Sequence, residues 1–446
     1  HGLGIRVLGG ADGSRLAHCV VERGRATGAS PLDSGGGLYI EGSNPDVRHC
    51  TIRNNFAKRS GGAIHLENSS ATLRDNVIVD NTAGGGGGSA SGGAISMRDS
   101  APTLTGNTVR GNSVSVSGSY TTPSGLGGAI YSRSSDPWLE RNVISDNVVS
   151  GHLNSDARGG AMYVYYGDPV LLNNTFSDNR TENGSGVYQT SEGGGLYIYY
   201  ASPVLVNTIL WNNEPEEIWI NAGSSPQVTA ITYSDVRGGR TGIVSDNPAA
   251  IDWLEGNIDA DPLFVDPAAG EYALQAGSPA IDAGAAYFEL GGEILLDLSP
   301  EDYVGPAPDI GALEFGSIGA SPPAGSPGEA SRISAGAQPL VVNAFDPATG
   351  EVSITFAPAC GATDHVAYSG DLSSVASLDW NGATCGLGND GAATVFVGEG
   401  SRFFVVVGHD DAVEGSYGRT SAAAERPEAE ALATCDLPQR LADTCD

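Results

Sequence analysis

A glycine pair followed by a small residue and an aliphatic residue recurs six times in the first half of the chain. The aliphatic residues are Leu38, Ile64, Ile95, Ile130, Met162 and Leu196, so successive repeats are 26, 31, 35, 32 and 34 residues long. This internal period constrains the fold more than any other feature. A chain that repeats one supersecondary unit of this length stacks the units side by side.

Each repeat also contains a Pro or Ala anchor, with further recurrent residues five and ten positions after it. The anchors are Pro45, Ala71, Pro102, Pro137, Pro169 and Pro203. Five residues later stand Cys50, Asn76, Asn107, Asn142, Asn174 and Thr208, and ten residues later Asn55, Asn81, Asn112, Asn147, Asn179 and Asn213. The second half of every repeat therefore has a fixed length, and the variation falls between the last Asn and the next glycine pair.

Between these positions apolar and polar residues alternate over four to six residues, as in AIHLEN, ATLRDN and VIVDN. Such segments are too short for helices and are typical of strands. We predict three strands per repeat, each pairing with its equivalent in the next turn to form a parallel β-solenoid. Inward Asn side chains then hydrogen-bond to the Asn above and below, because a buried amide needs a partner. The predicted ladder consists of Asn76, Asn107, Asn142 and Asn174.

The composition limits the classes of function. Asp and Glu number 53 against 22 Lys and Arg, which gives a net charge of −31. This charge repels nucleic acid and anionic lipid surfaces, so we expect neither as a partner. No run of about 18 apolar residues occurs, so no membrane insertion is expected. The first residues, GIRVLGG, favour a strand, and we expect His1 to be a processed end or the start of an internal fragment.

Six cysteines are an even set that suits disulfides in an oxidising compartment, which predicts a secreted or cell-surface protein. Cys19 takes, one repeat earlier, the ladder position that Cys50 holds. Parallel strands lie about 4.8 Å apart, within the Cα distances that a disulfide accepts, so we predict a Cys19–Cys50 bond. The alternative is two stacked free thiols that fill a core position.

The GGAI, FSDN and ISDN pieces resemble the repeats of right-handed β-helix surface proteins, including the polymorphic outer membrane proteins. The segments NIDADPLFVDPAAGEYALQAGSPAIDAG and APDIGALEF resemble the closing segment of many secreted bacterial parallel β-helix repeat proteins. The resemblance covers residues 14–316 and implies a right-handed, single-stranded parallel β-helix. It implies little about activity, because that family is mostly named by its shape.

A Pro/Gly/Ser-rich run, GSIGASPPAGSPGEAS, has the composition of a linker. Short β-rich runs follow it at sandwich spacing and resemble the fibronectin-III-like modules of secreted bacterial proteins. We therefore expect an all-β chain with a parallel β-helix over residues 1–316, a linker over 317–331 and a small fibronectin-III-like β-sandwich over 332–446. The disulfides that close the shortest loops there are Cys360–Cys385 and Cys435–Cys445, and other pairings stay open.

Outward residues of the first strand in each repeat should form columns, because equivalent positions of a stacked solenoid lie above one another. The first column is Tyr39, His65, Ser96, Tyr131, Tyr163 and Tyr197, and the second is Glu41, Glu67, Arg98, Arg133, Tyr165 and Tyr199. Aromatic rings spaced by one coil can stack on sugar rings, and fixed charges can hold hydroxyls or uronates. This predicts a glycan-binding face formed by Tyr39, Tyr131, Tyr163, Tyr165, Tyr197 and Tyr199. The alternative is that exposed tyrosines merely cover the sheet.

The same face holds candidate catalytic residues of acid, base and cation types, namely His65, Glu67, Arg98, Arg133 and, in the loop before this coil, Lys58. A polysaccharide lyase needs a cation or metal to neutralise the uronate and a base to take the C5 proton, and the resemblance to β-helix lyases implies this placement. Glu41 and Glu67 could instead serve a glycosidase. The adjacent-Asp and Gly-His-Gly motifs of polygalacturonase-like hydrolases and the Trp-Ile-Asp-His motif of pectate lyases are missing from the helix sequence, which favours a protein without catalysis.

Metal sites and loops complete the set of candidate features. One candidate metal column is His18, His49 and Asp75, and one candidate Ca²⁺ cluster is Asp259, Asp261 and Asp266. Solvated turns are the favoured interpretation of both, so no cofactor is expected. The long polar segments NSVSVSGSYTTPSGL, NVVSGHLNSDARG and NRTENGSGVYQTSE are predicted to be recognition loops beside the tyrosine face.

Together these features favour a secreted or cell-surface protein with a structural or adhesive role that binds an extracellular polysaccharide or cell-surface glycan. The alternative is a lyase or hydrolase of an acidic polysaccharide that uses the same face. A solenoid end exposes unpaired backbone groups unless it is covered, and we expect the segment over residues 214–316 and the last module to cover one end. Docking of a second copy at the other end would give head-to-tail filaments.

Overall fold

The computed structural model of the chain describes residues 4–10, 13–84, 88–117, 123–152, 155–183, 190–223, 227–316, 341–346, 351–356, 362–371, 382–388, 390–396 and 402–409. The chain divides into two compact units, His1–Phe315 and Gly316–Asp446. The predicted linker over residues 317–331 lies outside the described residues.

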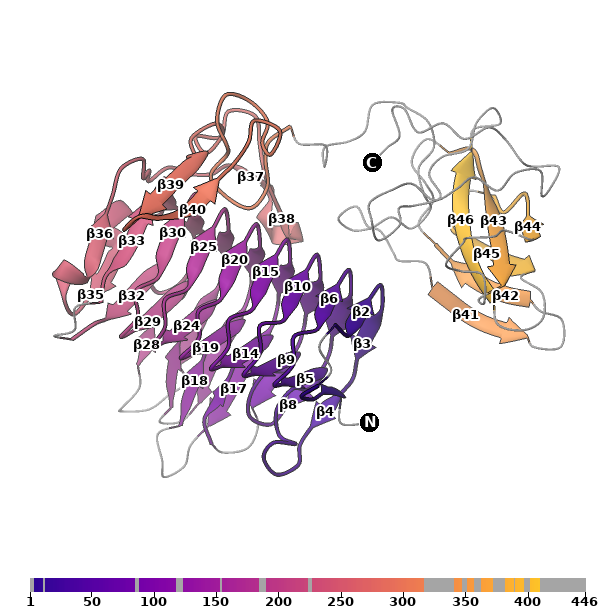
Figure 1. Ribbon diagram of the computed structural model, residues 1–446, viewed down its shortest axis with the longest axis horizontal. Helices are drawn as coiled ribbons and strands as arrows, with labels where there is room; N and C mark the ends of the chain where they lie inside the picture. Colours follow the sequence, from indigo (N-terminus) through magenta and orange to yellow (C-terminus); the bar gives the residue numbers. More distant parts are fainter. Residues whose placement is uncertain are drawn as a thin grey trace. The chain divides into compact units, whose positions relative to one another are not determined.

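The first unit is a parallel β-helix whose coils each contribute one strand to three long sheets (Figure 1). The first sheet contains β1 (Ile5–Val7), β5 (Leu38–Glu41), β9 (Ile64–Glu67), β14 (Ile95–Arg98), β19 (Ile130–Arg133), β24 (Met162–Tyr165), β29 (Leu196–Tyr199), β32 (Ile218–Asn221) and β35 (Ile243–Ser245). The second sheet contains β2 (Arg15–Ala17), β6 (Asp46–Arg48), β10 (Thr72–Arg74), β15 (Thr103–Thr105), β20 (Trp138–Glu140), β25 (Val170–Leu172), β30 (Val204–Val206), β33 (Thr229–Thr232) and β36 (Ile251–Trp253). The third contains β3 (Val20–Glu22), β7 (Thr51–Arg53), β11 (Val77–Val79), β16 (Thr108–Arg110), β21 (Val143–Ser145), β26 (Thr175–Ser177), β31 (Ile209–Trp211) and β34 (Asp235–Val236).

Every strand pairs in register with the equivalent strand of the next coil, so like residues lie above like. Ile95, for example, pairs with Ile64 on one side and Ile130 on the other. These columns point inward and form one continuous apolar core along the helix. Burial of these aliphatic columns supplies the main stabilisation, because each fully buried side chain contributes about 1.5–3 kcal/mol.

The recurrent glycine pair forms the turn into each strand of the first sheet. The first glycine of the pair is left-handed in every repeat, with φ of +63° at Gly92 and +66° at Gly127, a conformation that favours glycine. The second approaches the backbone of the following coil. A Cβ built on Gly93 would lie 2.2 Å from the carbonyl oxygen of Gly128. Glycine is therefore required at both positions, at the first for its dihedral angle and at the second for lack of space.

Two columns of buried Asn side chains run along the inner turns of the coils. In the first, Asn76, Asn107 and Asn142 each donate from Nδ2 to Oδ1 of the next Asn, at 3.0, 2.9 and 3.0 Å, and the column reaches Asn174. Their backbone N–H groups donate to the same oxygens. A second column of the same geometry links Asn55, Asn81, Asn112, Asn147, Asn179 and Asn213. The amides thereby satisfy turn backbone groups that would otherwise be buried without partners.

The second column ends on a buried carboxylate. Glu217 accepts hydrogen bonds from the backbone N–H and from Nδ2 of Asn213, in the place where the next ladder oxygen would lie. Burial raises the pKa of Glu217 to about 7, and these hydrogen bonds oppose the rise. Burial likewise raises the pKa of Asp235 in a later coil to about 7. Both groups therefore bind protons more tightly in the folded chain than in the unfolded chain.

A consequence for stability is expected between the ordinary pKa values of these carboxyls, 4.5 for Glu217 and 3.8 for Asp235, and their raised values of about 7. A carboxyl whose folded pKa is raised contributes stability that is complete below the unfolded pKa and is lost as pH rises through the folded pKa. We expect the free energy of unfolding to fall across this window, by an amount of the order of 3 kcal/mol for each carboxyl. Urea unfolding at pH 5 and pH 8 measures this change, and Glu217→Gln should make it smaller. The exposed Glu255→Gln is the control and should show the same change with pH as wild type. If Glu217→Gln also shows the wild-type change, the raised pKa of Glu217 would be contradicted.

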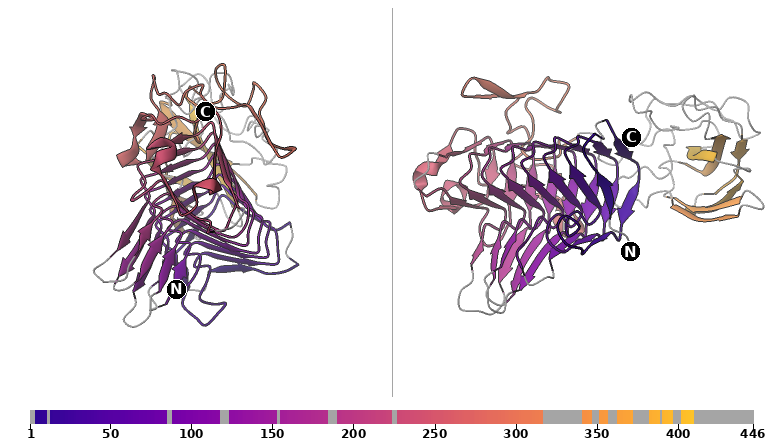
Figure 2. Two further views of the ribbon diagram at one scale, coloured as in Figure 1. Left: turned by 90° about the vertical axis from the view of Figure 1, so that its left-hand side faces the viewer. Right: turned by 60° about the horizontal axis from the view of Figure 1, so that its bottom comes forward.

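Two additional sheets extend from one corner of the coils, and we call them together the fin. One consists of β4 (Arg25–Ala26), β8 (Phe56–Ala57), β12 (Thr82–Gly84), β17 (Ser113–Ser117), β22 (Val148–His152) and β27 (Arg180–Asn183). The other consists of β13 (Ala90–Ser91), β18 (Ser124–Leu126), β23 (Asp156–Arg158) and β28 (Ser191–Glu192). In both Figure 1 and Figure 2 the fin lies on the side away from the hairpins at the end of this unit.

The fin corrects the prediction of three strands per repeat followed by polar loops. The described parts of the long variable segments are mostly strands, which pair from coil to coil. Their small apolar residues form a core of their own, made of Ala83, Ala90, Val114, Val116, Val149 and Ala157. The alternation in SVSVS is the sequence signal of this layer, because one face of each strand is buried and the other is polar.

The last part of the first unit folds back along the outside of the second and third sheets. It contains two antiparallel hairpins, β37 (Phe264–Asp266) with β38 (Glu271–Leu274), and β39 (Tyr287–Leu290) with β40 (Glu293–Asp297). Phe264, Tyr272 and Leu274 pack on Val143 and Ile209 of the third sheet. Leu296 packs on Leu172 and Val206 of the second sheet. The hairpins thus cover outward apolar residues that the helix alone would leave exposed.

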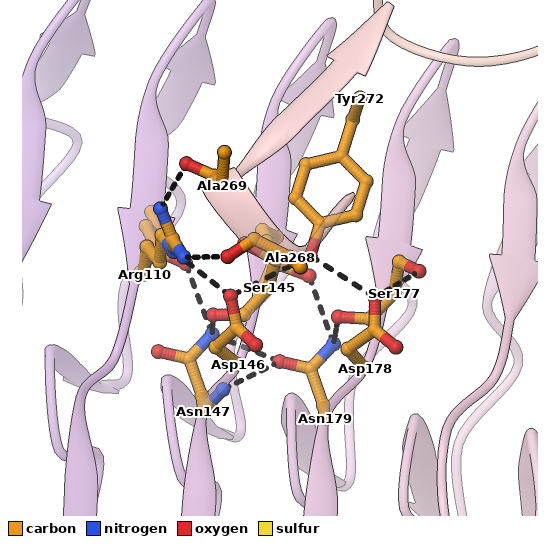
Figure 3. A network of polar contacts seen from close by, with 12 residues as sticks. Arg110, Ser145, Asp146, Asn147, Ser177, Asp178, Asn179, Ala268, Ala269 and Tyr272 are labelled. Atoms are coloured by element: carbon orange, nitrogen blue, oxygen red, sulfur yellow. Dashed lines mark hydrogen bonds and ion pairs between the residues drawn. The ribbon is translucent and has the colours of Figure 1, made fainter. Parts of the chain in front are cut away.

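A polar network holds the first hairpin to the third sheet (Figure 3). The Tyr272 hydroxyl lies 3.1 Å from Asp178 and 3.5 Å from Asp146, on consecutive coils. Arg110 pairs with Asp146 at 2.8 Å and donates to the carbonyl oxygen of Ala269 at 2.9 Å. One guanidinium therefore joins the coil to the hairpin turn, through an ion pair on one side and a hydrogen bond to a backbone carbonyl on the other.

The described strands of the second unit form two antiparallel sheets. One contains β41 (Val341–Asp346), β42 (Glu351–Thr355) and β45 (Ala392–Phe396), and the other β43 (Asp364–Asp371), β44 (Gly382–Thr384) and β46 (Arg402–His409). Val352, Ile354 and Val395 of the first sheet share a buried cluster with Ala367 and Val406 of the second. The antiparallel strand pairs are the feature of this unit that agrees with the predicted small β-sandwich.

The structure does not contain the predicted Cys19–Cys50 disulfide. Both cysteines are free thiols, with their Sγ atoms 3.3 Å apart. In-register stacking keeps the two Cβ atoms one strand spacing apart and parallel, whereas a disulfide needs Cβ atoms about 3.8 Å apart. Burial and the contact with Cys50 also raise the pKa of Cys19 to about 12, which disfavours the reactive thiolate. In the second unit Cys385 is disulfide-bonded, while Cys360, Cys435 and Cys445 lie outside the described residues.

Candidate functional site

A groove lies between the outer face of the first sheet and the fin, over the coils that contain β5, β9, β14 and β19. Its volume is about 400 Å³. From the first sheet it is lined by Tyr39, His65, Glu67, Arg98, Tyr131 and Arg133, and from the fin side by Arg59, Ser60, Ala90 and Ser91. The strand period of two turns these sheet residues outward, because the alternate residues are inward core aliphatics. The fin converts an outward sheet face into the floor of a groove.

The floor of the groove contains two stacked aromatic rings, those of Tyr39 and His65. The ring of His65 stacks on Tyr39 with centroids 5.2 Å apart, and the Arg6 guanidinium lies 3.8 Å from the Tyr39 centroid on the other side. His65 is 8% exposed. Burial lowers the pKa of His65 to about 4, so its imidazole is neutral at pH 7. Among the described residues its Nδ1 is buried without a hydrogen-bond partner.

Glu67 connects the polar groups of the groove. The His65 Nε2 atom lies 3.7 Å from one carboxylate oxygen, and the Arg98 guanidinium lies 3.5 Å from the other. The Tyr39 hydroxyl donates to Glu41 at 3.1 Å and approaches Glu67 at 3.4 Å. Burial and these carboxylates together raise the pKa of Tyr39. The in-register coils therefore bring a neutral base, two carboxylates and a cation into one cluster.

The arginines of the groove differ in how their charge is balanced. Arg98 pairs with Glu67 and with Asp99, at 3.5 and 3.3 Å. Among the ion pairs of the described residues, none includes Arg59 or Arg133. The Arg133 guanidinium instead lies 5.5 Å from the ring centroid of Tyr165 in the next coil. Lys58 is exposed and does not line the groove.

Three of the tyrosines predicted to present open faces are buried. Tyr39, Tyr163 and Tyr197 are 1%, 5% and 3% exposed. Tyr131, Tyr163 and Tyr197 form a stack, and Arg158 of the fin lies over the Tyr197 ring at 5.6 Å while it pairs with Glu192 at 2.7 Å. The expectation of an open tyrosine wall is therefore wrong for these three residues. Tyr39 lies between Arg6 and His65, Tyr163 lies between Tyr131 and Tyr197, and Arg158 of the fin covers Tyr197.

The second column remains accessible beyond the groove. Tyr165 and Tyr199 are half-buried and stack at 5.2 Å, and each is followed by another tyrosine, Tyr166 and Tyr200. The latter two turn residues are missing from the predicted set. The tyrosine doublets in MYVYY and LYIYY are the sequence signal that could have identified Tyr166 and Tyr200, because each doublet places two rings at the same end of consecutive strands.

The candidate metal groups form other contacts. His18 stacks on His49 at 4.8 Å, and His49 lies 3.8 Å from Asp75. Asp259, Asp261 and Asp266 each accept a hydrogen bond from a nearby turn N–H. Across the residues that the structure describes, no group of three or more His, Cys, Asp or Glu side chains is arranged to hold a metal ion.

Within the same described ranges, none of the helices has the length and apolarity needed to span a bilayer.

The geometry defines a parallel β-helix whose side groove is closed by an accessory fin. A family model described as "Right handed beta helix region" matches residues 1–144 and 89–257, which together exceed half of the chain. The chain therefore belongs to the right-handed β-helix family, which includes both adhesins and polysaccharide-degrading enzymes. No curated protein and no solved structure matched the chain.

Proposed function

We propose that this protein is a secreted or cell-surface β-helix protein that binds an acidic polysaccharide in the groove. The observation that carries the proposal is the pair Arg59 and Arg133, which line the groove without an ion pair among the described residues. The chain has a net charge of −31 and 53 Asp and Glu residues, so carboxylate partners are abundant elsewhere on its surface. Two guanidiniums left without such partners in one groove favour an external anion as their partner.

The chemistry of the groove fits a uronate or another acidic sugar. A guanidinium binds a carboxylate through two parallel hydrogen bonds, which gives both energy and orientation. Ser60 and Ser91, whose hydroxyl oxygens lie 3.1 Å apart at the edge of the groove, offer hydrogen bonds to sugar hydroxyls. A linear glycan would lie along the helix axis, because Arg98 and Arg133 belong to one column that continues into Tyr165 and Tyr199.

A second candidate function is β-elimination in the same groove, and the cluster of His65, Glu67 and Arg98 favours it. A neutral imidazole is the protonation state that a base needs, and Arg98 would neutralise the uronate carboxylate. In this reaction the C5 proton passes to the base, the C4–O bond breaks, and the leaving oxygen takes a proton. Because His65 is deeply buried, glycan binding is the first candidate function and catalysis is the second.

The binding proposal predicts the effect of Arg133→Ala. We expect affinity for a uronate polymer to fall at least about tenfold, because a charge-assisted hydrogen bond contributes about 1.5–3 kcal/mol. Isothermal titration calorimetry at low salt measures it. The matched control is Arg53→Ala, which removes the same charge from an arginine that pairs with Glu22 at 2.9 Å on the third sheet.

Equal weakening in the two variants would show that net charge alone attracts the polymer, and this would contradict a groove site. Ultraviolet absorbance of new unsaturated ends separates binding from lyase activity. Ends that form with wild-type protein and vanish in Arg98→Ala would replace the first candidate with the second.

A further inference from the structure

Four tyrosines form a compact cluster where two consecutive strands of the first sheet end. We call Tyr165, Tyr166, Tyr199 and Tyr200 the tyrosine quartet. Across the coils, Tyr165 stacks on Tyr199 with centroids 5.2 Å apart, and Tyr166 stacks on Tyr200 at 5.8 Å. Within each coil the two rings meet edge to face, at 4.7 and 4.6 Å. Every ring therefore contacts one neighbour in its own coil and one in the next.

The backbone fixes this arrangement. Tyr165 and Tyr199 are paired in register, so their rings are separated by about one strand spacing. The backbone N–H of Tyr166 donates to the carbonyl oxygen of Tyr199 at 3.1 Å, which holds the two turns together. The Tyr200 hydroxyl lies against Gly223 of the following coil, where a Cβ would come within 2.9 Å of it. The rings are thus held near one another before any reaction.

The quartet differs from the other tyrosine stack in access. Tyr163 and Tyr197 are 5% and 3% exposed beneath the fin, whereas Tyr166 is 44% exposed. Tyr165, Tyr199 and Tyr200 are half-buried. A soluble oxidant can therefore reach the quartet at Tyr166. The phenol of the next coil that lies nearest to a radical on Tyr166 is the stacked ring of Tyr200.

We propose that the quartet is a site of oxidative coupling, in which Tyr166 and Tyr200 form a dityrosine that joins two consecutive coils. The oxidant is hydrogen peroxide used by a haem peroxidase. Each phenol loses one electron and one proton to give a phenoxyl radical, and the two radicals form a carbon–carbon bond between ring carbons ortho to the oxygens. The hydrogens on those carbons then shift to the oxygens and restore both hydroxyls. In net terms two hydrogen atoms leave the protein and reduce one peroxide to two waters.

The cross-link would add a covalent tie where the coils are otherwise held by ladder hydrogen bonds and packing. A bond between coils restricts the unfolded chain, as other cross-links do, and so stabilises the solenoid. This inference does not depend on glycan binding, because it uses residues outside the groove and a different chemistry.

The test treats the purified full chain with a haem peroxidase and hydrogen peroxide and follows dityrosine fluorescence. We expect fluorescence in the monomer band of a denaturing gel, and mass spectrometry of digested protein should show a peptide that joins Tyr166 to Tyr200. Tyr166→Phe and Tyr200→Phe keep the stacked rings but cannot form the phenoxyl radical, so each should lose this peptide and most of the fluorescence.

Tyr287→Phe is the matched control, because Tyr287 is 51% exposed on a hairpin outside the quartet. This variant should retain the full signal. Fluorescence that persists unchanged in the Tyr166→Phe, Tyr200→Phe double variant would overturn the proposal. Dityrosine found only in covalent dimers would overturn it as well. Circular dichroism of the variants before oxidation checks that they are folded.

Discussion

Replacing Gly93 by alanine is expected to prevent the β-helix from folding. The new Cβ would lie 2.2 Å from the carbonyl oxygen of Gly128 in the next coil and 2.6 Å from the carbonyl oxygen of Ser113. Both contacts are with backbone, so no side chain can rotate away. The next coil would have to move away from Gly93, which breaks the in-register ladder and opens the core. A loss of more than about 4 kcal/mol is the expectation for such a change.

Circular dichroism and urea unfolding test this prediction, and the same coil supplies the control. A Cβ on Gly88 would have no other atom within 4 Å, and Gly88 lies outside the left-handed region, so Gly88→Ala should leave stability almost unchanged. If Gly93→Ala unfolds at the same urea concentration as wild type, the close approach of the coils at the glycine pair would be incorrect.

Replacing Asn142 by alanine is expected to destabilise the chain by about 4 kcal/mol or more. The side chain takes part in five hydrogen bonds, two accepted from Asn107 and three donated to Leu104, Glu140 and Asn174. Asn142 is 1% exposed, so water cannot replace them. Removal leaves several buried donors and acceptors unpaired, each at a cost of about 1–3 kcal/mol. Chemical denaturation measures the loss.

A graded series makes this prediction specific to the ladder. Asn142→Thr should lose less than Asn142→Ala, because Thr208 occupies the equivalent position in a later coil and its hydroxyl both donates and accepts there. Asn183→Ala, at an exposed position on the fin, should have little effect. Equal losses for alanine and threonine at position 142 would contradict the prediction that a hydroxyl can replace part of the amide hydrogen bonding in this column.

The periodic part of the fold was available from the sequence because its cause is local and repeated. The spacing between Pro102, Asn107 and Asn112 recurs without change, and a fixed spacing repeated over coils places equivalent side chains in columns whatever the details of each turn. The columns of the first sheet follow for the same reason, since one strand register aligns all of them. The residues of the groove floor could thus be named from the sequence, including His65, Glu67 and Arg98.

What covers those columns could not be found in the same way. The fin is built from segments of unequal length, and its strands become identifiable only when their neighbours from other coils are placed beside them. Its presence buries Tyr163 and Tyr197, which the alternation in the sequence assigns to the outside. Alternation distinguishes the inside of the coil from its outside, but it carries no information about a second layer that packs on the outside.

The cysteine pair shows the same limit at the scale of single atoms. The repeat correctly brings Cys19 and Cys50 to neighbouring coils, with their Sγ atoms 3.3 Å apart. Whether a bond forms depends on the separation and direction of the Cβ atoms, which the parallel stack sets.

The sequence by itself determined the period of this protein, its stacked columns and the identity of the residues in each column, because these follow from short-range spacing and from the need to bury apolar and amide side chains. Only the tertiary structure decided which outward residues are exposed, which arginines lack carboxylate partners among the described residues and where the terminal hairpins lie. Those properties arise from contacts between segments far apart in the chain, and such contacts depend on the packing of whole layers and not on any local pattern.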